Sequence, residues 1–270
     1  MTTNLPYGRD NLDTTILSAL EAAGKSRASL TQDDLSAADE FHIRGREATE
    51  ELLALAGFGG DQTILDVGCG IGGPARFLAS RAGCRVRGID LTAEFIRTAR
   101  VLTDVVGLAD RVEFVEGDAT GMPYEAGLFD GAWMIHISMN VPDKAALFRE
   151  IRRVVRPGGR LAIYEIVGGP GGEVHLPVPW ASSPAQSHLK LAEALRADIE
   201  SAGWTIGPWE DLSAPSLAWF QERLAATGPP PPVGLHLILG PEARTMLGNV
   251  ARNLEEDRVR VVRALAVAAS

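Results

Sequence analysis

The residues with the clearest chemical potential form a glycine-rich segment, Leu65-Asp66-Val67-Gly68-Cys69-Gly70-Ile71-Gly72-Gly73. The segment follows an apolar stretch that predicts a strand and precedes one that predicts a helix. Glycines let the backbone turn sharply and let a ligand approach without a Cβ in the way, while the start of the next helix offers free amide donors. This order of strand, glycine turn and helix predicts a nucleoside cofactor site.

An acidic residue stands where such a site needs one. Asp90 ends the second predicted strand, twenty residues after Gly70, and its carboxylate can accept hydrogen bonds from two ribose hydroxyls. The spacing Gly68-x-Gly70-x-x-Gly73 also satisfies the dinucleotide fingerprint, so NAD is an alternative cofactor. The glycine spacing therefore leaves the identity of the nucleoside open.

Three features favour S-adenosylmethionine over NAD. Asp66 stands two residues before the first glycine, where a carboxylate can bind an ammonium group directly or through water and would be poorly placed beside a pyrophosphate. Asp118, in Gly117-Asp118-Ala119 after the third predicted strand, can accept the adenine amino group. Arg156-Pro157-Gly158-Gly159 forms a tight turn directly before the fifth predicted strand.

Two histidines are candidates for acid–base chemistry. His136 follows the fourth predicted strand, and ligands of open α/β sheets collect at that edge. An imidazole with an ordinary pKa of about 6.5 suits a general base, and the alternative is a structural histidine that caps the strand. His42, between two predicted helices, could fold over the cofactor or lie on the solvated surface.

Several neighbouring side chains are candidates for acceptor binding. Arg44 could pair with a substrate carboxylate through its planar guanidinium, or be solvated. Trp180 and Trp133 could present ring faces to an ammonium group, although a tryptophan in mid-strand, as Trp133 is, more often belongs to the core. Met139 and Asn140 are expected to line the pocket.

The sequence offers little for a metal. His175, His188 and His236 share no metal-ligand spacing with one another or with nearby carboxylates. The two cysteines, Cys69 and Cys84, are too few for a disulfide scaffold or a four-cysteine zinc site. We therefore predict no metal centre.

The elements that must position these residues alternate between short apolar strands and helical stretches. Strands separated by ten to fifteen helical residues form right-handed βαβ units, so we predict a doubly wound, mostly parallel α/β sheet. The predicted strands are Thr63–Val67, Arg85–Ile89, Val112–Glu116, Phe129–Ile135 and Arg160–Ile166, and the helices between them are Pro74–Ala82, Ala93–Val106 and Lys144–Val155.

Other segments surround this core. Residues 1–62 predict an N-terminal helical cap, and the Rossmann-like core spans 63–211. Within the core, the glycine- and proline-rich stretch 167–187 predicts a lid. Residues 212–257 predict a helical cap insertion, and 258–270 predict a last core strand, with a helix from Arg258 to Ala269 as the alternative.

Composition limits the function classes. The 270 residues carry a formal net charge of −9 with no basic stretch, which disfavours nucleic acid as a partner. Met1 to Asn11 lacks the features of a signal peptide, and no apolar run reaches the ~18 residues of a membrane span. We expect a soluble cytoplasmic protein that has no membrane partner and that could form a homodimer.

Residues 40 to 211 resemble the class I S-adenosylmethionine-dependent methyltransferases in L-D-V-G-C-G-I-G-G, G-I-D-L, G-D-A, F-D-G-A-W and R-P-G-G-R. Within that superfamily, F-H-I-R-G-R-E-A-T at 41–49, H-I-S-M-N at 136–140 and P-V-P-W-A at 177–181 are similar to small-molecule methyltransferases of the sarcosine and dimethylglycine type. A more distant similarity is to quinone and tocopherol methyltransferases.

The resemblance implies a seven-stranded Rossmann-like sheet whose last strand is antiparallel. It also assigns the cofactor contacts. The methionine part would lie on Gly68, Cys69 and Gly70, the ribose on Asp90 and the adenine on Asp118 with Ala119, and Leu91 and Ile135 are expected at the same site.

The sequence thus predicts methyl transfer from S-adenosylmethionine to a small molecule, with S-adenosylhomocysteine as the product. The resemblance favours N-methylation of a small amine or amino acid. The alternative is O- or C-methylation of a secondary-metabolite, quinone-like or prenyl intermediate. A nicotinamide-dependent oxidoreductase and a silent cofactor-binding protein are the other hypotheses.

Overall fold

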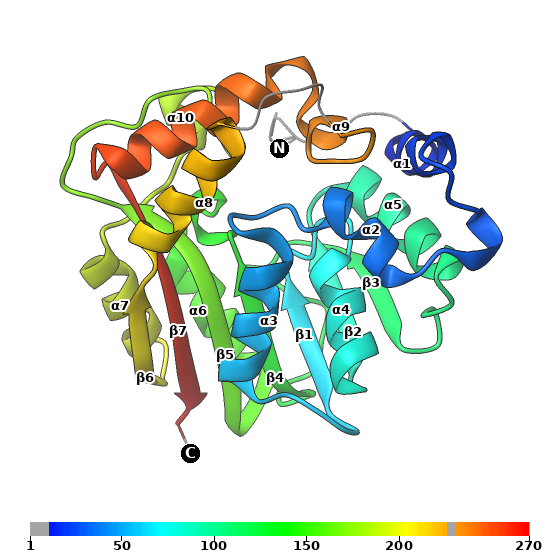
Figure 1. Cartoon of the computed structure of the whole chain (residues 1–270). Coiled ribbons are helices and arrows are strands. Elements are labelled where there is room, and N and C mark those ends of the chain that lie inside the picture. The colour runs from blue at the N-terminus through cyan, green and yellow to red at the C-terminus, as the bar shows by residue number, and fades with distance from the viewer. Residues whose placement is uncertain (1–10, 226–230, 270) are drawn as a thin grey trace.

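The computed structural model describes residues 11–225 and 231–269, and within them seven strands form one sheet in the order β3-β2-β1-β4-β5-β7-β6 (Figure 1). The first five strands run parallel, and β7 is antiparallel to both of its neighbours. The predicted doubly wound α/β fold is confirmed. The strands are β1 (Thr63–Val67), β2 (Arg85–Asp90), β3 (Val112–Glu116), β4 (Phe129–Ile135), β5 (Val155–Gly168), β6 (Trp204–Asp211) and β7 (Val259–Ala268).

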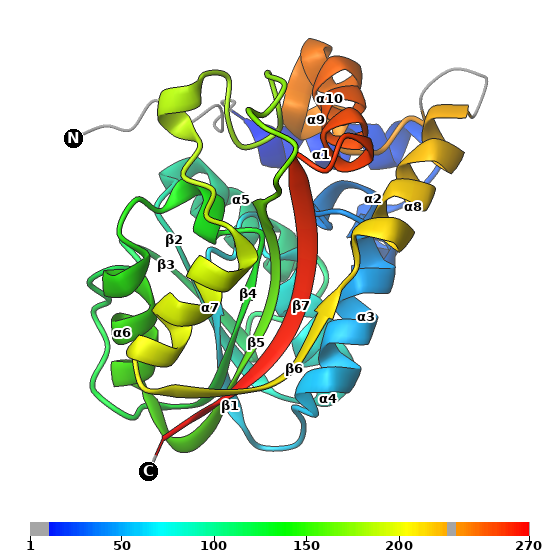
Figure 2. The same cartoon turned by 90° about the vertical axis from the view of Figure 1, so that its left-hand side faces the viewer.

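Helices cover both faces of the sheet, as Figure 2 shows from the side. One face packs against α3 (Gly45–Ala56), α4 (Gly73–Ala82) and α5 (Ala93–Val105), and the other against α6 (Lys144–Val154) and α7 (Ala192–Ser201). The central strand β5 is apolar along most of its length because Ala162 and Ile166 face one layer while Leu161 and Ile163 face the other.

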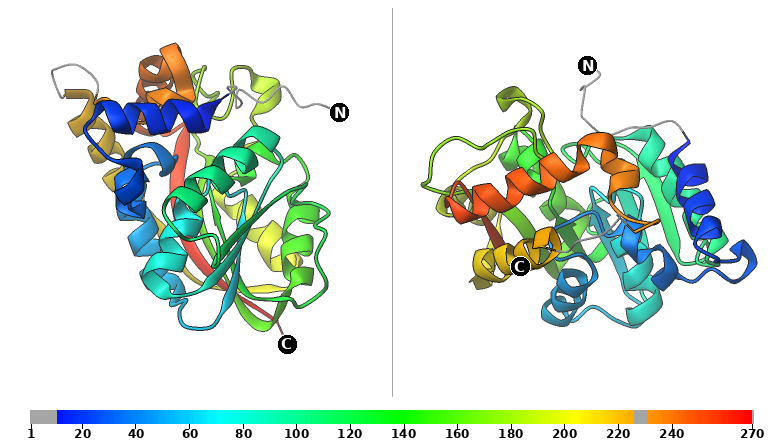
Figure 3. Two further views of the ribbon diagram at one scale, coloured as in Figure 1. Left: turned by 90° about the vertical axis from the view of Figure 1, so that its right-hand side faces the viewer. Right: turned by 45° about the horizontal axis from the view of Figure 1, so that its top comes forward.

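A third layer crosses the carboxyl ends of the parallel strands. It contains α1 (Leu12–Ala22), α2 (Gln32–Asp39), α8 (Ser213–Ala225), α9 (His236–Leu239) and α10 (Ala243–Glu255), with short 3-10 turns at Arg27–Ser29, Ser138–Asn140, Pro184–Gln186 and Gly240–Glu242 elsewhere in the chain. Figure 3 shows the blue α1 and the orange α9 and α10 above the sheet, and α1 contacts α9. No helix within the described residues is both long and apolar enough to cross a bilayer.

The structure differs from the predicted boundaries in one segment and decides between two alternatives in another. Within residues 1–62, α3 packs on β5 and β7 and belongs to the helix layer of the core, while residues 1–10 lie outside the described part. The C-terminal segment forms a strand and not the alternative helix, because β7 inserts between β5 and β6 and bonds to both.

The predicted lid is fixed to the rest of the protein. The Gly169 amide donates to the Arg258 carbonyl at 2.8 Å, and the Asn140 side chain donates to the Trp180 carbonyl at 2.9 Å. The Trp180 indole is buried and donates to Ser187 Oγ at 3.1 Å. In this structure the segment therefore lies against the protein as a wall, because residues distant in sequence supply its partners.

Candidate cofactor and acceptor site

A cavity runs along the carboxyl edge of the parallel strands, beneath the helices of the third layer. Its walls come from the loops after β1, β2, β3 and β4, from Ile166 on β5, and from α8, α9 and α10. The structure brings fourteen of the fifteen predicted site residues to this cavity. They are His42, Asp66, Gly68, Cys69, Gly70, Asp90, Leu91, Asp118, Ala119, Ile135, His136, Met139, Asn140 and Trp180.

The glycine turn after β1 packs against the protein at Gly68 and borders the cavity at Gly70. The amides of Gly68 and Cys69 donate to the Ile89 carbonyl at 2.7 and 3.1 Å. Gly68 has a φ of 68°, and a Cβ there would lie 2.1 Å from the Ile137 side chain. Gly70 has a φ of 54°, and its Cβ position has no protein atom within 4 Å. A ligand can therefore approach the backbone at Gly70.

Asp90 joins this turn to the end of β2. Its Oδ2 accepts from the Gly70 amide at 2.9 Å and its Oδ1 from the Thr92 amide at 2.8 Å. Burial raises the pKa of the carboxyl. Each carboxylate oxygen keeps acceptor capacity beyond its backbone bond, so Asp90 can receive the two hydroxyls of a ribose.

Two buried carboxyl groups on the cavity wall have oxygens without a hydrogen-bond partner among the described residues, Asp66 Oδ2 and Asp39 Oδ1. Burial, followed by the charge of Asp90, raises the pKa of Asp66 to about 8. Asp39 Oδ2 accepts from Arg76 Nη2 at 2.7 Å, and both side chains are fully buried. Unsatisfied buried carboxyl oxygens are costly, and an ammonium group would satisfy them.

Sequence reasoning missed Asp39 and Arg76. The available signal was Arg76 itself, because it stands between Ala75 and Phe77 on a helix whose first two turns are otherwise apolar and buried. A buried guanidinium requires an anionic partner, and the acids just before residue 41 were the candidates.

The loop after β3 presents a further acid. Asp118 Oδ1 accepts from the Thr120 amide at 2.8 Å and from its hydroxyl at 2.7 Å, which fixes the loop. Ala119 and the half-exposed Leu91 lie on the same part of the cavity wall. These side chains offer a planar ring a hydrogen-bond acceptor and apolar contacts.

His136 adopts an unusual backbone conformation at the end of β4. Its φ is 54°, and its amide donates to the Tyr164 carbonyl at 2.8 Å. Its ring stacks on that of Tyr164, with centroids 5.0 Å apart and an interplanar angle of 14°. Nε2 has no hydrogen-bond partner among the described residues, and burial and His42 hold the pKa well below 6.5. The imidazole is therefore neutral at pH 7 and able to accept a proton.

A buried carboxylate fixes the loop that follows His136. Glu165, on β5, accepts from the amides of Ile137 and Ser138 at 2.8 and 2.9 Å and from the Ser138 hydroxyl at 2.6 Å. Burial raises its pKa to about 7. Sequence reasoning did not single out Glu165, although an acid within the apolar run of β5 was a visible signal.

His42 faces the same group of rings from the segment between α2 and α3. Its Nε2 lies 2.9 Å from the Gly45 carbonyl and 3.0 Å from Thr49 Oγ1. Since a carbonyl only accepts, Nε2 carries the proton and Nδ1 is the free acceptor of the neutral ring. Burial lowers the pKa of His42 to about 4, and its ring stands 6.0 Å from that of His136 at 87°.

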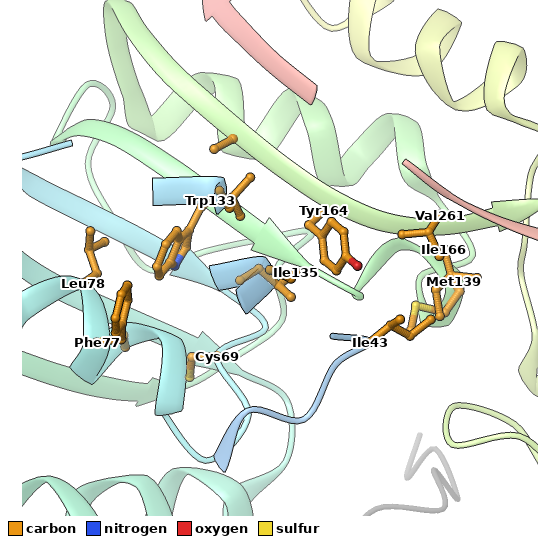
Figure 4. Close-up of a cluster of buried hydrophobic side chains, with 14 of the residues drawn as sticks. Ile43, Cys69, Phe77, Leu78, Trp133, Ile135, Met139, Tyr164, Ile166 and Val261 are labelled. Carbon is orange, nitrogen blue, oxygen red and sulfur yellow. The ribbon is translucent and has the colours of Figure 1, made fainter. Parts of the chain in front are cut away.

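Apolar side chains surround this group. Figure 4 shows Tyr164 between Ile135 on β4 and Ile166 on β5, with Met139 and Ile43 beyond them, and all five belong to one buried cluster. The histidines therefore lie in a water-poor environment, where a neutral imidazole is favoured over its charged form.

Residues 65–163 match the family model described as a methyltransferase domain. The match begins inside β1 and ends inside β5, so it includes the glycine turn, Asp90, Asp118 and His136.

Known proteins extend this likeness. Methyltransferase GfsG of Streptomyces halstedii is 40% identical over 134 residues, which are 50% of this chain and 48% of that protein. The chain therefore spans about half the length of GfsG. It spans less of other curated relatives, such as 32% of methyltransferase phqN from Penicillium fellutanum.

Solved structures share the fold of this chain. Geranyl diphosphate C-methyltransferase from Streptomyces coelicolor, in complex with S-adenosylhomocysteine, superposes with a TM-score of 0.68 at 21% identity over 82% of this chain and 78% of its own. A protein of Galdieria sulphuraria described as a sarcosine dimethylglycine methyltransferase gives 0.65 at 18% identity over 96% and 99%. SpnF, described as a cyclase, gives 0.64 at 23% identity over 94% and 93%.

One predicted site residue lies elsewhere than expected. The Arg44 guanidinium, proposed as a partner for a substrate carboxylate, bonds to Glu47 and Glu51 at 2.6 Å each and is not on the cavity wall. Glu51 also pairs with Arg263 on β7, so Arg44 connects the start of α3 to the sheet. Trp133 is fully buried in the core, as its mid-strand position suggested.

No group of three or more histidine, cysteine, aspartate or glutamate side chains within the described ranges could hold a metal ion. Both cysteines are buried and unbridged.

Proposed function

We propose that this chain binds S-adenosylmethionine and transfers its methyl group to a small molecule held beside His136. The observation that carries the proposal is the glycine turn with two acids beside it on the cavity wall, the buried Asp66 and the partly buried Asp90. Asp66, together with Asp39, would hold the ammonium group of the methionine part, and Asp90 the ribose. A pyrophosphate would meet these carboxylates with like charge, which disfavours NAD.

The residues of the chain position the acceptor and take its proton. Bound S-adenosylmethionine supplies a methyl group on a positively charged sulfur; the acceptor atom bonds to the methyl carbon as the carbon–sulfur bond breaks, and that electron pair stays on sulfur. The apolar cap excludes water. The unpartnered Nε2 of neutral His136 receives the proton that the acceptor releases.

Two candidate reactions differ in the acceptor atom, which is nitrogen in one and oxygen in the other. The resemblance to sarcosine and dimethylglycine methyltransferases favours N-methylation of a small amine. A specific observation favours O-methylation, because a neutral, unpartnered imidazole at the end of β4 is what a hydroxyl needs in order to lose its proton. The inference in the following section develops this second candidate.

The test is the affinity for the cofactor. Replacing Asp90 with Ala removes two charge-assisted ribose bonds and should weaken S-adenosylmethionine binding by about 1.5–3 kcal/mol in a calorimetric titration. Asp90→Asn keeps part of the bonding to Gly70 and Thr92 and should lose less. Asp104→Ala, an exposed acid on α5, is the matched control and should leave affinity unchanged. An unaltered dissociation constant in folded Asp90→Ala would refute the assignment, as would tighter binding of NAD than of S-adenosylmethionine.

A further inference from the structure

The charged side chains of the cavity are unevenly distributed. Its acids lie at the cofactor end: Asp66 is on β1, Asp90 ends β2, Asp118 follows β3, and Asp39 is packed against Gly73 at the start of α4. Within the described residues, no arginine or lysine lines any part of the cavity.

The other end is walled by apolar and aromatic side chains. The polar side chains of this wall are His136, His42 and Asn140, and the Asn140 amide donates to the Trp180 carbonyl. The remaining wall includes Met139, Ile166, Trp180, Phe220, Ile238 and Leu247. The residues from α8, α9 and α10 all come from the cap insertion, so this insertion determines which molecules fit.

Cations close to the cavity are engaged elsewhere. Arg76 Nη2 donates to Asp39 Oδ2 and to the Ile71 carbonyl, and Lys144 Nζ donates to the Val141 and His188 carbonyls. Arg44 is committed to Glu47 and Glu51. Arg223 on α8 lies 3.8 Å from the ring of Trp219 and is exposed to solvent, outside the cavity wall. A buried carboxylate or phosphate at the acceptor end would therefore lack a cationic partner, and an ammonium group would lack a carboxylate partner. A buried charge without an opposite charge costs several kcal/mol.

We infer that the acceptor is an uncharged, largely apolar molecule that presents a hydroxyl group to His136 and packs its body against the cap insertion. This inference rests on the proposed function and specifies its substrate class. It argues against amino acids, phosphorylated amines and prenyl diphosphates. The hydroxyl oxygen forms the new bond to carbon, and its proton passes to Nε2 of His136.

A series of three ligands that differ only in the charge of the head group tests the inference. Geraniol, geranylamine and geranyl diphosphate share one apolar chain and carry a neutral, a cationic and an anionic head. We expect geraniol to bind the S-adenosylhomocysteine-loaded protein about tenfold or more tightly than either charged relative in calorimetric titrations, because a charged head finds no buried partner.

A positive charge introduced into the apolar cavity wall should reverse the preference for a neutral head group. Leu247→Arg puts a cation on the α10 side of the cavity and should weaken geraniol and strengthen geranyl diphosphate, each by about tenfold. Leu128→Arg, at a partly exposed leucine before β4 that does not line the cavity, is the matched control. The comparison of the three ligands on the wild-type protein tests the inference even if neither variant folds.

The outcomes separate the two proposals. Equal or tighter binding of geranylamine or geranyl diphosphate to the wild type would overturn the inference, as would no binding of geraniol up to its solubility limit. S-adenosylhomocysteine is titrated first and separately. If it fails to bind while the head-group preference persists without it, the proposed function fails and the assignment of the acceptor end survives.

Discussion

At the residue scale, the contact that we propose between Asp66 and the ammonium group of the cofactor would make cofactor binding depend on pH. Its pKa of about 8 means that the carboxyl is mostly protonated at pH 6 in the free protein. An ammonium ligand favours the carboxylate, so binding must release the proton. This proton release determines the direction in which the affinity changes with pH.

We predict that the affinity for S-adenosylhomocysteine rises as pH increases from 6 to 7.5, with a slope of up to about tenfold per unit. Titrations in buffers of different ionisation enthalpy should detect the released proton. In Asp66→Asn the affinity should be lower and the slope should disappear. A slope that persists in this variant would exclude Asp66 as its source.

His136 gives a second residue-scale prediction. His136→Ala should lower turnover of a hydroxyl acceptor by about 10²–10⁴-fold, the usual contribution of a general base. Affinity for S-adenosylmethionine should stay within about threefold, because the cofactor contacts lie elsewhere. If turnover also stayed within about threefold of wild type, His136 would be a structural residue.

The pH profile of the wild type distinguishes a buried base from an ordinary histidine. Because the pKa of His136 lies well below 6.5, the ring remains neutral as pH falls from 8 to 6, and turnover at saturating cofactor should stay flat over that range. A loss of turnover with a midpoint near 6.5 would show a solvated imidazole instead.

At the element scale, β5 holds the loop after β4 in place through Glu165. Glu165→Ala leaves the buried amides of Ile137 and Ser138 without an acceptor and should destabilise the fold by about 2–4 kcal/mol. Glu165→Gln keeps an acceptor and should lose less, as measured by urea unfolding. Turnover should fall in parallel, because the loop orients His136. Equal stability of Glu165→Ala and wild type would contradict this role.

Some features of this protein could be predicted from the sequence, and others, such as the contacts of the lid segment, could not. The strands, the glycine turn and the acids beside it on the cavity wall were predictable because they depend on local periodicity and on spacings within single βαβ units. The fixation of the segment by Asn140, and the pairing of Arg44 with Glu51, depend on side chains that only the folded chain brings together. The same holds for Asp39 and Arg76, whose bond spans 37 residues.

The fixed wall predicts a specific exchange pattern. The amides of Val178, Ala181 and His188 are bonded to the Ala181, Val178 and Met139 carbonyls, so they should exchange slowly with or without ligands. Hydrogen exchange followed by mass spectrometry checks this. Fast exchange in the free protein that slows when both ligands bind would restore the lid that the sequence predicted.

At the scale of the whole molecule, we propose that the cofactor binds at the carboxyl edge of the sheet and the acceptor beneath the cap insertion. The split explains why the fold alone does not fix the reaction, since a cyclase and methyltransferases of unlike acceptors share it. The chemistry must be argued from the acids at one end and from the neutral histidine and apolar wall at the other.

Transfer of an isotopic label tests the central claim most directly. The protein is incubated with trideuteromethyl S-adenosylmethionine and a panel of neutral alcohols and phenols, with sarcosine and ethanolamine for comparison, and products are identified by mass spectrometry. We predict a deuterated methyl ether and S-adenosylhomocysteine in equal amounts, with both lost in Asp90→Ala and strongly reduced in His136→Ala. No S-adenosylhomocysteine above the protein-free rate, or an acceptor converted without gaining the label, would contradict the account.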